Sequence, residues 1–276
     1  MRSNYIQEIK QFIEEAQAVL ITAGAGMGVD SGLPDFRGDE GFWRAYPAIK
    51  ELQISFEEMA NPQWFVTKPS LAWAFYGHRL NLYKNTVPHN GFAMLLDLVR
   101  KKNNDYFIMT SNVDGQFQKA GFSKDKIVEI HGSIYHFQCI ENCMGDIWDA
   151  DDKEIEIDME KFEALDIPQC KYCSNIARPN ILMFGDRNWN VMRTFTQEER
   201  FDAWIGNVRS DGKKLVIIEI GAGTAIPTIQ STGEKLAKKI KGAKLIRINP
   251  REYYLNRYRG WGIPYGGMDG LKKILT

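Results

Sequence analysis

Short, continuously apolar runs alternate with amphipathic stretches along this chain. The apolar runs predict four buried strands, at Ala18–Ala23, Tyr106–Thr110, Leu215–Ile220 and Lys244–Ile248. Helical periodicity separates them, notably at Gly91–Lys101 and Gly233–Lys241. A strand that is apolar on both faces belongs in a parallel sheet covered by helices. The pattern therefore predicts an α/β fold, with a Rossmann-like parallel sheet whose strands end at a common ligand-binding edge.

Two stretches interrupt this alternation. Residues 40–90 contain helical patterns but no clear strand, and residues 133–180 contain all four cysteines among turn residues. The second stretch is too short for a large core of its own, so we expect a metal to stabilise it. We expect residues 1–39, 91–132 and 181–276 to form the Rossmann-like domain, residues 40–90 the helical part of a small domain, and residues 133–180 its zinc-binding module.

Composition narrows the class of protein. The 276 residues are 44% hydrophobic and 25% charged, and Lys plus Arg equals Asp plus Glu at 35 each. A balanced charge gives no general attraction to nucleic acid or membranes, so a charged partner must be recognised by a local patch. The N-terminus does not resemble a secretory signal, and no apolar run reaches the roughly 18 residues that span a bilayer. We expect a cytoplasmic protein with no nucleic-acid and no membrane partner, and the oligomeric state is not indicated.

The cysteines form two tight pairs. Cys139 and Cys143 are followed, after 26 intervening residues, by Cys170 and Cys173. In a reducing compartment this spacing favours a metal over disulfides. Four thiolates suit tetrahedral zinc in a closed structural site, which has no open position for catalysis. We therefore predict a structural zinc ion and no activation of water by it.

Glycine-rich turns follow two of the predicted strands. Gly24-Ala25-Gly26 ends the first strand, and Gly221-Ala222-Gly223 ends the third. Glycines let a backbone approach a pyrophosphate closely, and exposed N–H groups receive phosphate oxygens, although each turn alone is equally compatible with a simple tight turn. Asn249-Pro250 ends the fourth strand. All three endings lie at the sheet edge expected to hold a nucleotide.

Further polar residues belong to the same predicted edge. The loop SGLPDFRG places an acid, Asp35, and an arginine, Arg37, close to where a dinucleotide would lie. The alternative to a cofactor contact is that these two residues form a surface ion pair. Asn112 and Asp114 follow the second strand, where they suit a ribose or an amide but also a turn or a helix cap. His131 comes about 17 residues later. Histidine is the commonest general acid or base, although a lone histidine is more often structural.

The chain resembles the sirtuin family in the order and spacing of these motifs. From Ala18 to Asn249 they are GAG, SGLPDFRG, SNVD, HG, the paired cysteines, RPNILMFGD, GAG and the asparagine itself. The resemblance implies an NAD-dependent protein-lysine deacylase, with NAD as cosubstrate and one structural zinc ion per chain. It implies that NAD and an acylated-lysine protein or peptide meet between the large and the small domain. The implied products are nicotinamide, the free lysine and O-acyl-ADP-ribose.

The functional residues of the family map onto positions of this chain. The resemblance implies a catalytic role for Asn112 and for His131, the latter as general base. It implies contacts to the cofactor from Gly24, Ala25, Gly26, Asp35, Phe36, Arg37, Ser111, Asn112, Val113, Asp114, Gly221, Ala222, Gly223, Asn249 and Pro250. Ile181–Phe184 resembles the strand that pairs with the substrate peptide, and contacts to that peptide are expected from Leu182, Phe184 and Gly185.

A tyrosine and an arginine bear on the choice of acyl group. Tyr76 and Arg79 share one face of a predicted helix, Ser70–Tyr83. In the sirtuins that prefer succinyl- or malonyl-lysine, such a pair receives the acyl carboxylate, so the resemblance implies a preference for acidic acyl groups here. A charge-assisted hydrogen bond of this kind contributes about 1.5–3 kcal/mol. The alternative is that Arg79 faces water.

Some positions depart from the family pattern and leave other functions open. Gly28 stands where the family has serine, Val29 where it has alanine, and Ser111 where it has glutamine. Ala222 and Gly223 stand in place of a threonine and a serine, and Asp186 in place of a glutamate. None removes the candidate base or the cysteines, so we expect activity. A protein ADP-ribosyltransferase or NAD hydrolase is the main alternative. A non-catalytic module that binds NAD or ADP-ribose is the third.

Overall fold

A six-stranded sheet is the centre of the structure, a computed structural model that describes residues 3–35, 38–150 and 153–276. All its neighbouring strands are parallel, in the order β11-β10-β9-β1-β2-β3. Their bounds are β1 (Ala18–Ala23), β2 (Tyr106–Thr110), β3 (Ile127–Glu129), β9 (Leu215–Ile220), β10 (Lys244–Ile248) and β11 (Gly260–Ile263). The predicted α/β fold is confirmed, and the four strands predicted from apolar runs have the expected bounds.

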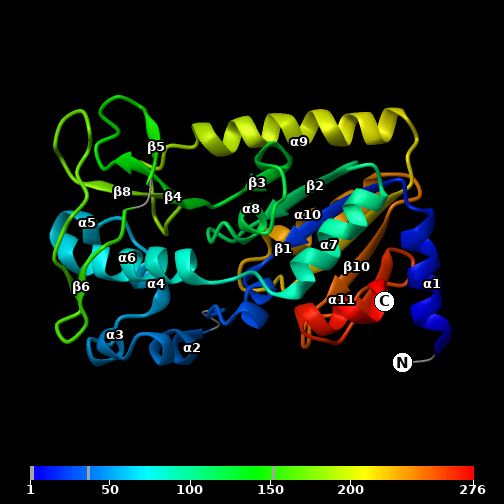
Figure 1. Cartoon of the computed structure of the whole chain (residues 1–276), viewed down its shortest axis with the longest axis horizontal. Coiled ribbons are helices and arrows are strands. Elements are labelled where there is room, and N and C mark those ends of the chain that lie inside the picture. Colours follow the sequence, from blue (N-terminus) through cyan, green and yellow to red (C-terminus); the bar gives the residue numbers. More distant parts are fainter. Residues whose placement is uncertain (1–2, 36–37, 151–152) are drawn as a thin grey trace.

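Helices cover both faces of this sheet (Figure 1). Among the described residues, four helices pack on one face: α1 (Ser3–Glu15), α7 (Asn90–Lys101), α8 (Gln116–Lys119) and α11 (Gly267–Leu275). The other face is covered by α9 (Met192–Ser210) and α10 (Thr228–Lys239). Along β1, Val19 and Ile21 join the first core, while Ala18 and Leu20 join the second. Because successive side chains of a strand point to opposite faces, burial on both sides makes the whole strand apolar.

Several elements of this domain were not predicted from the sequence, among them β11 and α9. β11 contains Gly260, where φ is +154° and an added Cβ would lie 1.7 Å from the carbonyl oxygen of Leu245, so only glycine fits beside β10. The buried face of α9 begins with Thr194 and Gln197 and becomes apolar only at Phe201, which hides its helical periodicity. Neither α9 nor any other helix in the described part of the chain combines the length and apolarity needed to cross a membrane.

The two interrupting stretches pack together at the left of Figure 1 around a core of their own. Their elements are α2 (Gly38–Ala45), α3 (Pro47–Glu51), α4 (Phe56–Met59), α5 (Trp64–Thr67), α6 (Pro69–Asn85), β4 (Gly132–Cys139), β5 (Ile147–Asp149), β6 (Ile157–Asp158), β7 (Glu163–Ala164) and β8 (Ala177–Ile181). The indole N–H of Trp73 donates to the carbonyl of Ala177 (2.9 Å), and Gly77 leaves room for Ile155. The helices and the antiparallel sheet β5-β4-β8 thus depend on one another. The division into domains stays a prediction.

The order of the parallel strands creates a switch point between β1 and β9. From β1 the chain continues to β2 and β3 on one side, and it then crosses to β9, β10 and β11 on the other side. Ligands of open α/β sheets bind where such a reversal leaves a crevice at the carboxyl ends of the strands. Gly24 and Gly221 directly follow the two strands that flank this point.

Candidate active site

Gly24 and Gly221 interlock at the switch point. The N–H of Gly24 donates to the carbonyl of Ile220, and the N–H of Gly26 to that of Gly221, both at 3.0 Å. A Cβ added to Gly24 would lie 2.8 Å from Cα of Ala222. One added to Gly221, where φ is +63°, would lie 2.3 Å from the carbonyl carbon of Gly26. The two loops therefore meet backbone to backbone, and this cradle of peptide groups suits a pyrophosphate.

Polar contacts fix the loop after β1 to two helices. Nδ1 of His89 accepts the N–H of Gly91 at the start of α7, so its Nε2 donates to the carbonyl of Met27 (2.9 Å). The Oγ of Ser31 accepts the N–H of His89 (2.9 Å). Asp30, in the 3-10 turn η2 (Val29–Ser31), accepts the N–H of Met268 in α11 (2.7 Å). Sequence reasoning missed Asp30 and His89, although a histidine two residues before the predicted helix Gly91–Lys101 was an available signal for a cap.

The segment after β2 contacts the same loop. The N–H of Ser111 donates to the carbonyl of Ala23 (3.1 Å), and Nδ2 of Asn112 donates to the carbonyl of Gly24 (3.0 Å). Asp114 is buried, and this burial raises the pKa of its carboxyl to about 6, although the N–H two residues on donates to Oδ1 (3.0 Å). The structure thus brings Ser111 and Asn112 against the glycine loop.

His131 lies in the short connection between β3 and β4, next to this segment and to β8. The N–H of Ile130 donates to the carbonyl of Thr110 (2.9 Å), and the carbonyl of His131 accepts the N–H of Leu182 (2.9 Å). Burial lowers the pKa of the imidazole, while a hydrogen bond to the backbone of Ser111 acts in the opposite direction. The neutral ring is therefore favoured near neutral pH, as a proton acceptor requires.

The segment expected to pair with a peptide is shorter as a strand than the sequence indicated. β8 ends at Ile181, so Leu182–Phe184 lie beyond the strand, and the pairing of this segment with a peptide stays a prediction. The N–H of Phe184 donates to the carbonyl of Ala60 in the small domain (2.9 Å) instead of to a neighbouring strand. Leu182 remains exposed over 38% of its surface.

A buried ion pair explains why the strand ends there. Gly185 adopts a φ of +68°, which turns the chain back, and Asp186 then pairs with Arg178 (Nη1 to Oδ1, 3.0 Å). A second nitrogen of the same guanidinium donates to the carbonyl of Ile181 (2.7 Å). The pair is almost completely shielded from solvent, so it fixes the turn after β8 firmly.

The loops after β9 and β10 are joined beside the switch point. Nδ2 of the buried Asn249 donates to the carbonyl of Ala222 (2.7 Å), and its Oδ1 accepts the N–H of Glu252 (2.9 Å). The carboxylate of Glu252 accepts the N–H and the hydroxyl of Thr224 (2.8 and 2.7 Å). Gly223 lies beside that carboxylate, and Pro250 is exposed.

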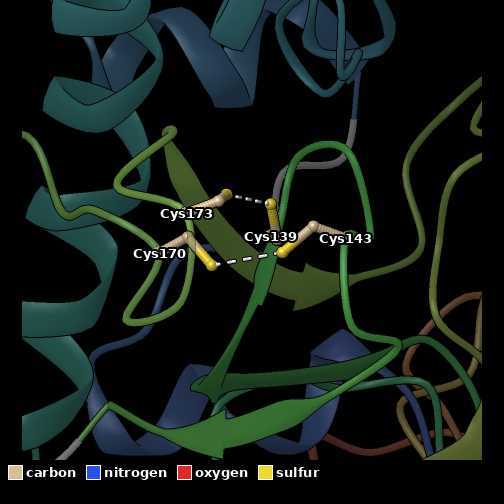
Figure 2. A group of neighbouring side chains, drawn as sticks. All are labelled: Cys139, Cys143, Cys170 and Cys173. Carbon is tan, nitrogen blue, oxygen red and sulfur yellow. Dashed lines mark hydrogen bonds between the residues drawn. The ribbon is translucent and has the colours of Figure 1, made fainter.

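The four cysteines converge in the small domain, as Figure 2 shows. Their Sγ atoms all lie within 4.8 Å of one another, with separations of 3.7 Å for Cys139–Cys173 and for Cys143–Cys170. Tetrahedral zinc with Zn–S bonds of about 2.3 Å requires sulfurs about 3.8 Å apart. The thiolates therefore fit one structural zinc ion, which would join β4 to the turn before β8.

Tyr76 and Arg79 are both buried in α6. The guanidinium lies 5.2 to 5.7 Å from the ring centroids of Phe75, Tyr76 and Tyr83, and its Nε donates to the Tyr83 hydroxyl (3.1 Å). Only 7% of Arg79 is exposed, so the alternative that it faces water is wrong. Burial raises the pKa of Asp114, and the charge of Arg79 partly offsets this rise, so Arg79 lies within electrostatic range of that carboxyl.

Comparisons with known proteins agree with this geometry. The Sir2 family model matches residues 24–205. The chain belongs to the Sir2 family. An "NAD-dependent protein deacylase" of Leptospira interrogans is 30% identical over 88% of this chain and 87% of its own length. One of Thermococcus sibiricus is 30% identical over 90% and 86%. A solved Sir2 homologue–NAD complex has the same fold, with a TM-score of 0.73, 23% identity, and coverage of 98% of this chain and 92% of that one.

Several departures from the Sir2 pattern have local explanations. A Cβ on Gly28 would lie 3.2 Å from the Leu33 side chain, so a serine there would have to displace it. The hydroxyl of Ser111 points back to the carbonyl of Ala23 (3.5 Å). Asp186 replaces a longer acid yet still reaches its arginine. Val29 is 46% exposed, so its branched side chain is not enclosed by the core.

Two expected contacts cannot be placed. Phe36 and Arg37 lie outside the described residues, whereas Asp35, the last residue before them, is half-buried. The side chain of Val113 is buried in the core of the small domain. It does not belong to the core on the sheet that contains Met27 of the loop after β1. The roles of all these residues toward a cofactor stay predictions.

Proposed function

We propose that this Sir2 protein is an NAD-dependent protein-lysine deacylase that transfers the acyl group to ADP-ribose and releases nicotinamide. The observation that carries the proposal is a row of backbone hydrogen bonds. It joins Ala23 to Ser111, Thr110 to Ile130, and His131 to Leu182. The loop for the cofactor, the candidate base and the segment for the peptide are therefore neighbours at one edge of the sheet.

The named relatives support the same activity. Those from Leptospira interrogans and Thermococcus sibiricus are both called NAD-dependent protein deacylases, and the chain spans most of their length. One solved Sir2 structure is described as bound to a propionylated peptide, at a TM-score of 0.68. NAD as cosubstrate and an acylated lysine as the second substrate are consistent with these descriptions and with the interlocked glycines.

In the proposed reaction the acyl oxygen of the lysine amide attacks the anomeric carbon of the nicotinamide ribose. Nicotinamide leaves with the bonding electron pair. His131 then takes a proton from a ribose hydroxyl, and the hydroxyl oxygen attacks the imidate carbon. The C–N bond of the former imidate then breaks and lysine leaves as the amine. Water adds to the acyl carbon that remains and gives O-acyl-ADP-ribose. The lowered pKa of His131 suits this step, because a neutral imidazole can accept the proton at neutral pH.

We also propose a preference for acyl groups that end in a carboxylate. Arg79 offers a guanidinium within a ring of aromatic side chains, and the hydroxyl of Tyr83 orients its Nε. In such an apolar setting a charge-assisted bond to a carboxylate is stronger than in water. Tyr76, three residues earlier on the same helix, is the second expected contact.

One experiment tests the deacylase proposal. The purified protein and the variant His131→Ala are incubated with NAD and acetyl-, malonyl- or succinyl-lysine peptides, and the products are identified by mass spectrometry. We expect O-acyl-ADP-ribose from the unsubstituted protein only. His136→Ala is the matched control, because that histidine lies in β4 and pairs with Asp149, and it should retain turnover. Free ADP-ribose or ADP-ribosylated protein formed without peptide would instead favour the hydrolase or transferase alternative.

The acyl preference is tested by removing one hydroxyl or one charge. Tyr76→Phe and Arg79→Met should each reduce kcat/KM for the succinyl peptide by about tenfold or more, since each removes a bond to the carboxylate. Deacetylation should change little. Tyr258→Phe changes a side chain that is 91% exposed and should change neither activity. Equal losses toward acetyl and succinyl peptides would refute the carboxylate role and leave the deacylase proposal intact.

A further inference from the structure

Positive charge is unevenly distributed along this chain. Residues 233–259 contain nine Lys or Arg and only two Asp or Glu, within a protein whose charges balance at 35 each. This segment covers most of α10, then β10, and the loop that leads to β11. Net charge averages over the whole surface, so the expectation of no nucleic-acid partner does not extend to one strongly basic face.

Contacts show that α10 and the loop of residues 250–259 form one continuous face. Glu234 of α10 pairs with Arg247 (3.0 Å) and with Arg259 (2.9 Å). The carbonyl of Tyr258 accepts a hydrogen bond from Lys244 Nζ (2.7 Å). Arg247 also donates to the carbonyl of Tyr254 (3.3 Å). The loop is therefore tied along the edge of the sheet beside the helix.

The ion pairs within this face leave it strongly positive. Arg247 is buried and pairs with the buried Glu219, so it contributes to the fold. The side chains of six other cations lie exposed to solvent, at Lys235, Lys238, Lys239, Lys241, Arg251 and Arg257. Because Lys238 lies one helical turn after Glu234, it points to the side of α10 that the loop occupies. Lys238 therefore lies on the side of the helix that faces the loop carrying Arg251 and Arg257.

Two tyrosines of the loop project from this basic face. Tyr258 is 91% exposed and Tyr254 is 84% exposed, more than the other large hydrophobic side chains described as exposed. Exposing whole aromatic rings gains no burial for the folded protein. Rings interleaved with cations are, however, the combination that binds single-stranded nucleic acid, because bases stack on the rings while the cations follow the phosphates.

We propose that the face formed by α10 and residues 250–259 binds single-stranded nucleic acid. An acidic protein or a membrane would also bind the cations. Neither partner, however, has planar bases that stack on two projecting tyrosine rings. A duplex hides the faces of its bases, so the rings favour an unpaired strand. The combination of rings and cations therefore favours a single strand with exposed bases over the other partners.

This surface adjoins the candidate active site only at its first residues, Pro250 and Glu252, and its tyrosines lie further along the loop. β10 and β11 are parallel, so the loop must run from the carboxyl edge of the sheet back to the opposite edge. Tyr258 lies beside Lys244, the first residue of β10, whereas Asn249 follows its last residue. The proposal therefore does not rest on the deacylase activity, and NAD should not compete with the strand.

The test is fluorescence anisotropy of the full chain with a labelled oligothymidylate of about 20 nucleotides, long enough for the site sizes of such proteins. Titrations run from about 50 to about 200 mM salt. Tyr254→Ala/Tyr258→Ala should weaken binding by about tenfold or more. Lys238→Gln/Lys239→Gln should lower the slope of log K against log salt by about 1.4, because two phosphate contacts are lost. Lys50→Gln/Lys101→Gln removes two exposed lysines elsewhere and should leave binding unchanged.

Competitors decide between this partner and others. A duplex of the same length and heparin, which has charges but no bases, should bind more weakly than the single strand, and the tyrosine variant should not affect heparin. No binding to the oligonucleotide, equal binding by the tyrosine variant, competition by NAD, or a preference for phosphatidylserine vesicles would each overturn the proposal. Deacylase turnover of every variant, measured in parallel, shows that the variants are folded.

Discussion

Burial shifts two ionisable groups of the site in opposite directions for one physical reason. Removing a charge from water is unfavourable, so burial disfavours the protonated form of His131 and the ionised form of Asp114. The pKa of the histidine is therefore lowered, and that of the aspartate is raised to about 6. Near neutral pH the imidazole is ready to accept a proton, as the proposed reaction requires.

The pH dependence of turnover follows from His131. Because the neutral ring is the active form, kcat should fall as the pH drops through its folded pKa, below the ordinary value of about 6.5, and stay level just above it. The measurement is a pH–rate profile at saturating NAD and peptide. A profile that rises as the pH falls would show that a protonated group acts instead.

Asp114 should make the fold less stable as the pH rises. Its carboxyl ionises at about pH 3.8 in the unfolded chain but at about 6 in the folded protein, so ionisation disfavours folding across this window. Asp114→Asn should therefore add up to about 3 kcal/mol to the free energy of unfolding above pH 6, and little near pH 4. Urea denaturation at both ends of the window measures this. Asp97→Asn, at an exposed carboxylate of α7, should show no comparable pH-dependent gain.

At the scale of elements, the loops after β1 and β9 approach each other so closely that no larger residue fits at Gly221. Gly221→Ala combines a φ of +63° with a Cβ only 2.3 Å from the Gly26 backbone. Gly212 has the same φ but open space around it, so Gly212→Ala measures the backbone strain alone, about 1–2 kcal/mol. We expect Gly221→Ala to lower the melting temperature more than Gly212→Ala and to weaken NAD binding by about tenfold or more. Equal effects of the two variants would show that the loops are not in close contact.

The same elements show what the sequence could predict. The strands β1, β2, β9 and β10 were predicted with their observed bounds because burial on both faces makes them continuously apolar. β11 was missed because its glycines serve close approaches to the backbones of Leu245 and Tyr253. α10 begins before the predicted Gly233. The cysteine cluster followed from spacing alone. The contacts of His89 and Asp30 with the glycine loop were not predictable, since they join segments far apart in the sequence.

At the scale of the whole molecule, the site depends on two parts with separate cores. The sheet domain packs its side chains on both faces of β1, whereas the small domain has one core that α6 and β8 share. His131 immediately precedes β4, the strand that ends in Cys139. A change at the metal site can therefore reach the candidate base along a single strand.

Removal of zinc should accordingly disorder one part of the molecule and leave the other. We expect about one zinc ion per chain, and chelation should raise hydrogen exchange in α6, β4 and β8 while β1 and β9 stay protected by their own cores. Turnover should be lost with it, because the segment that contacts His131 continues from β8. Cys143→Ser, at an exposed ligand, should reproduce the exchange pattern, and chelation of this variant should add little further change. An equal loss of protection in β1 and β9 would contradict this prediction. It would show that the metal supports the sheet as well as the core shared by α6 and β8, so that the small domain does not unfold as an independent unit.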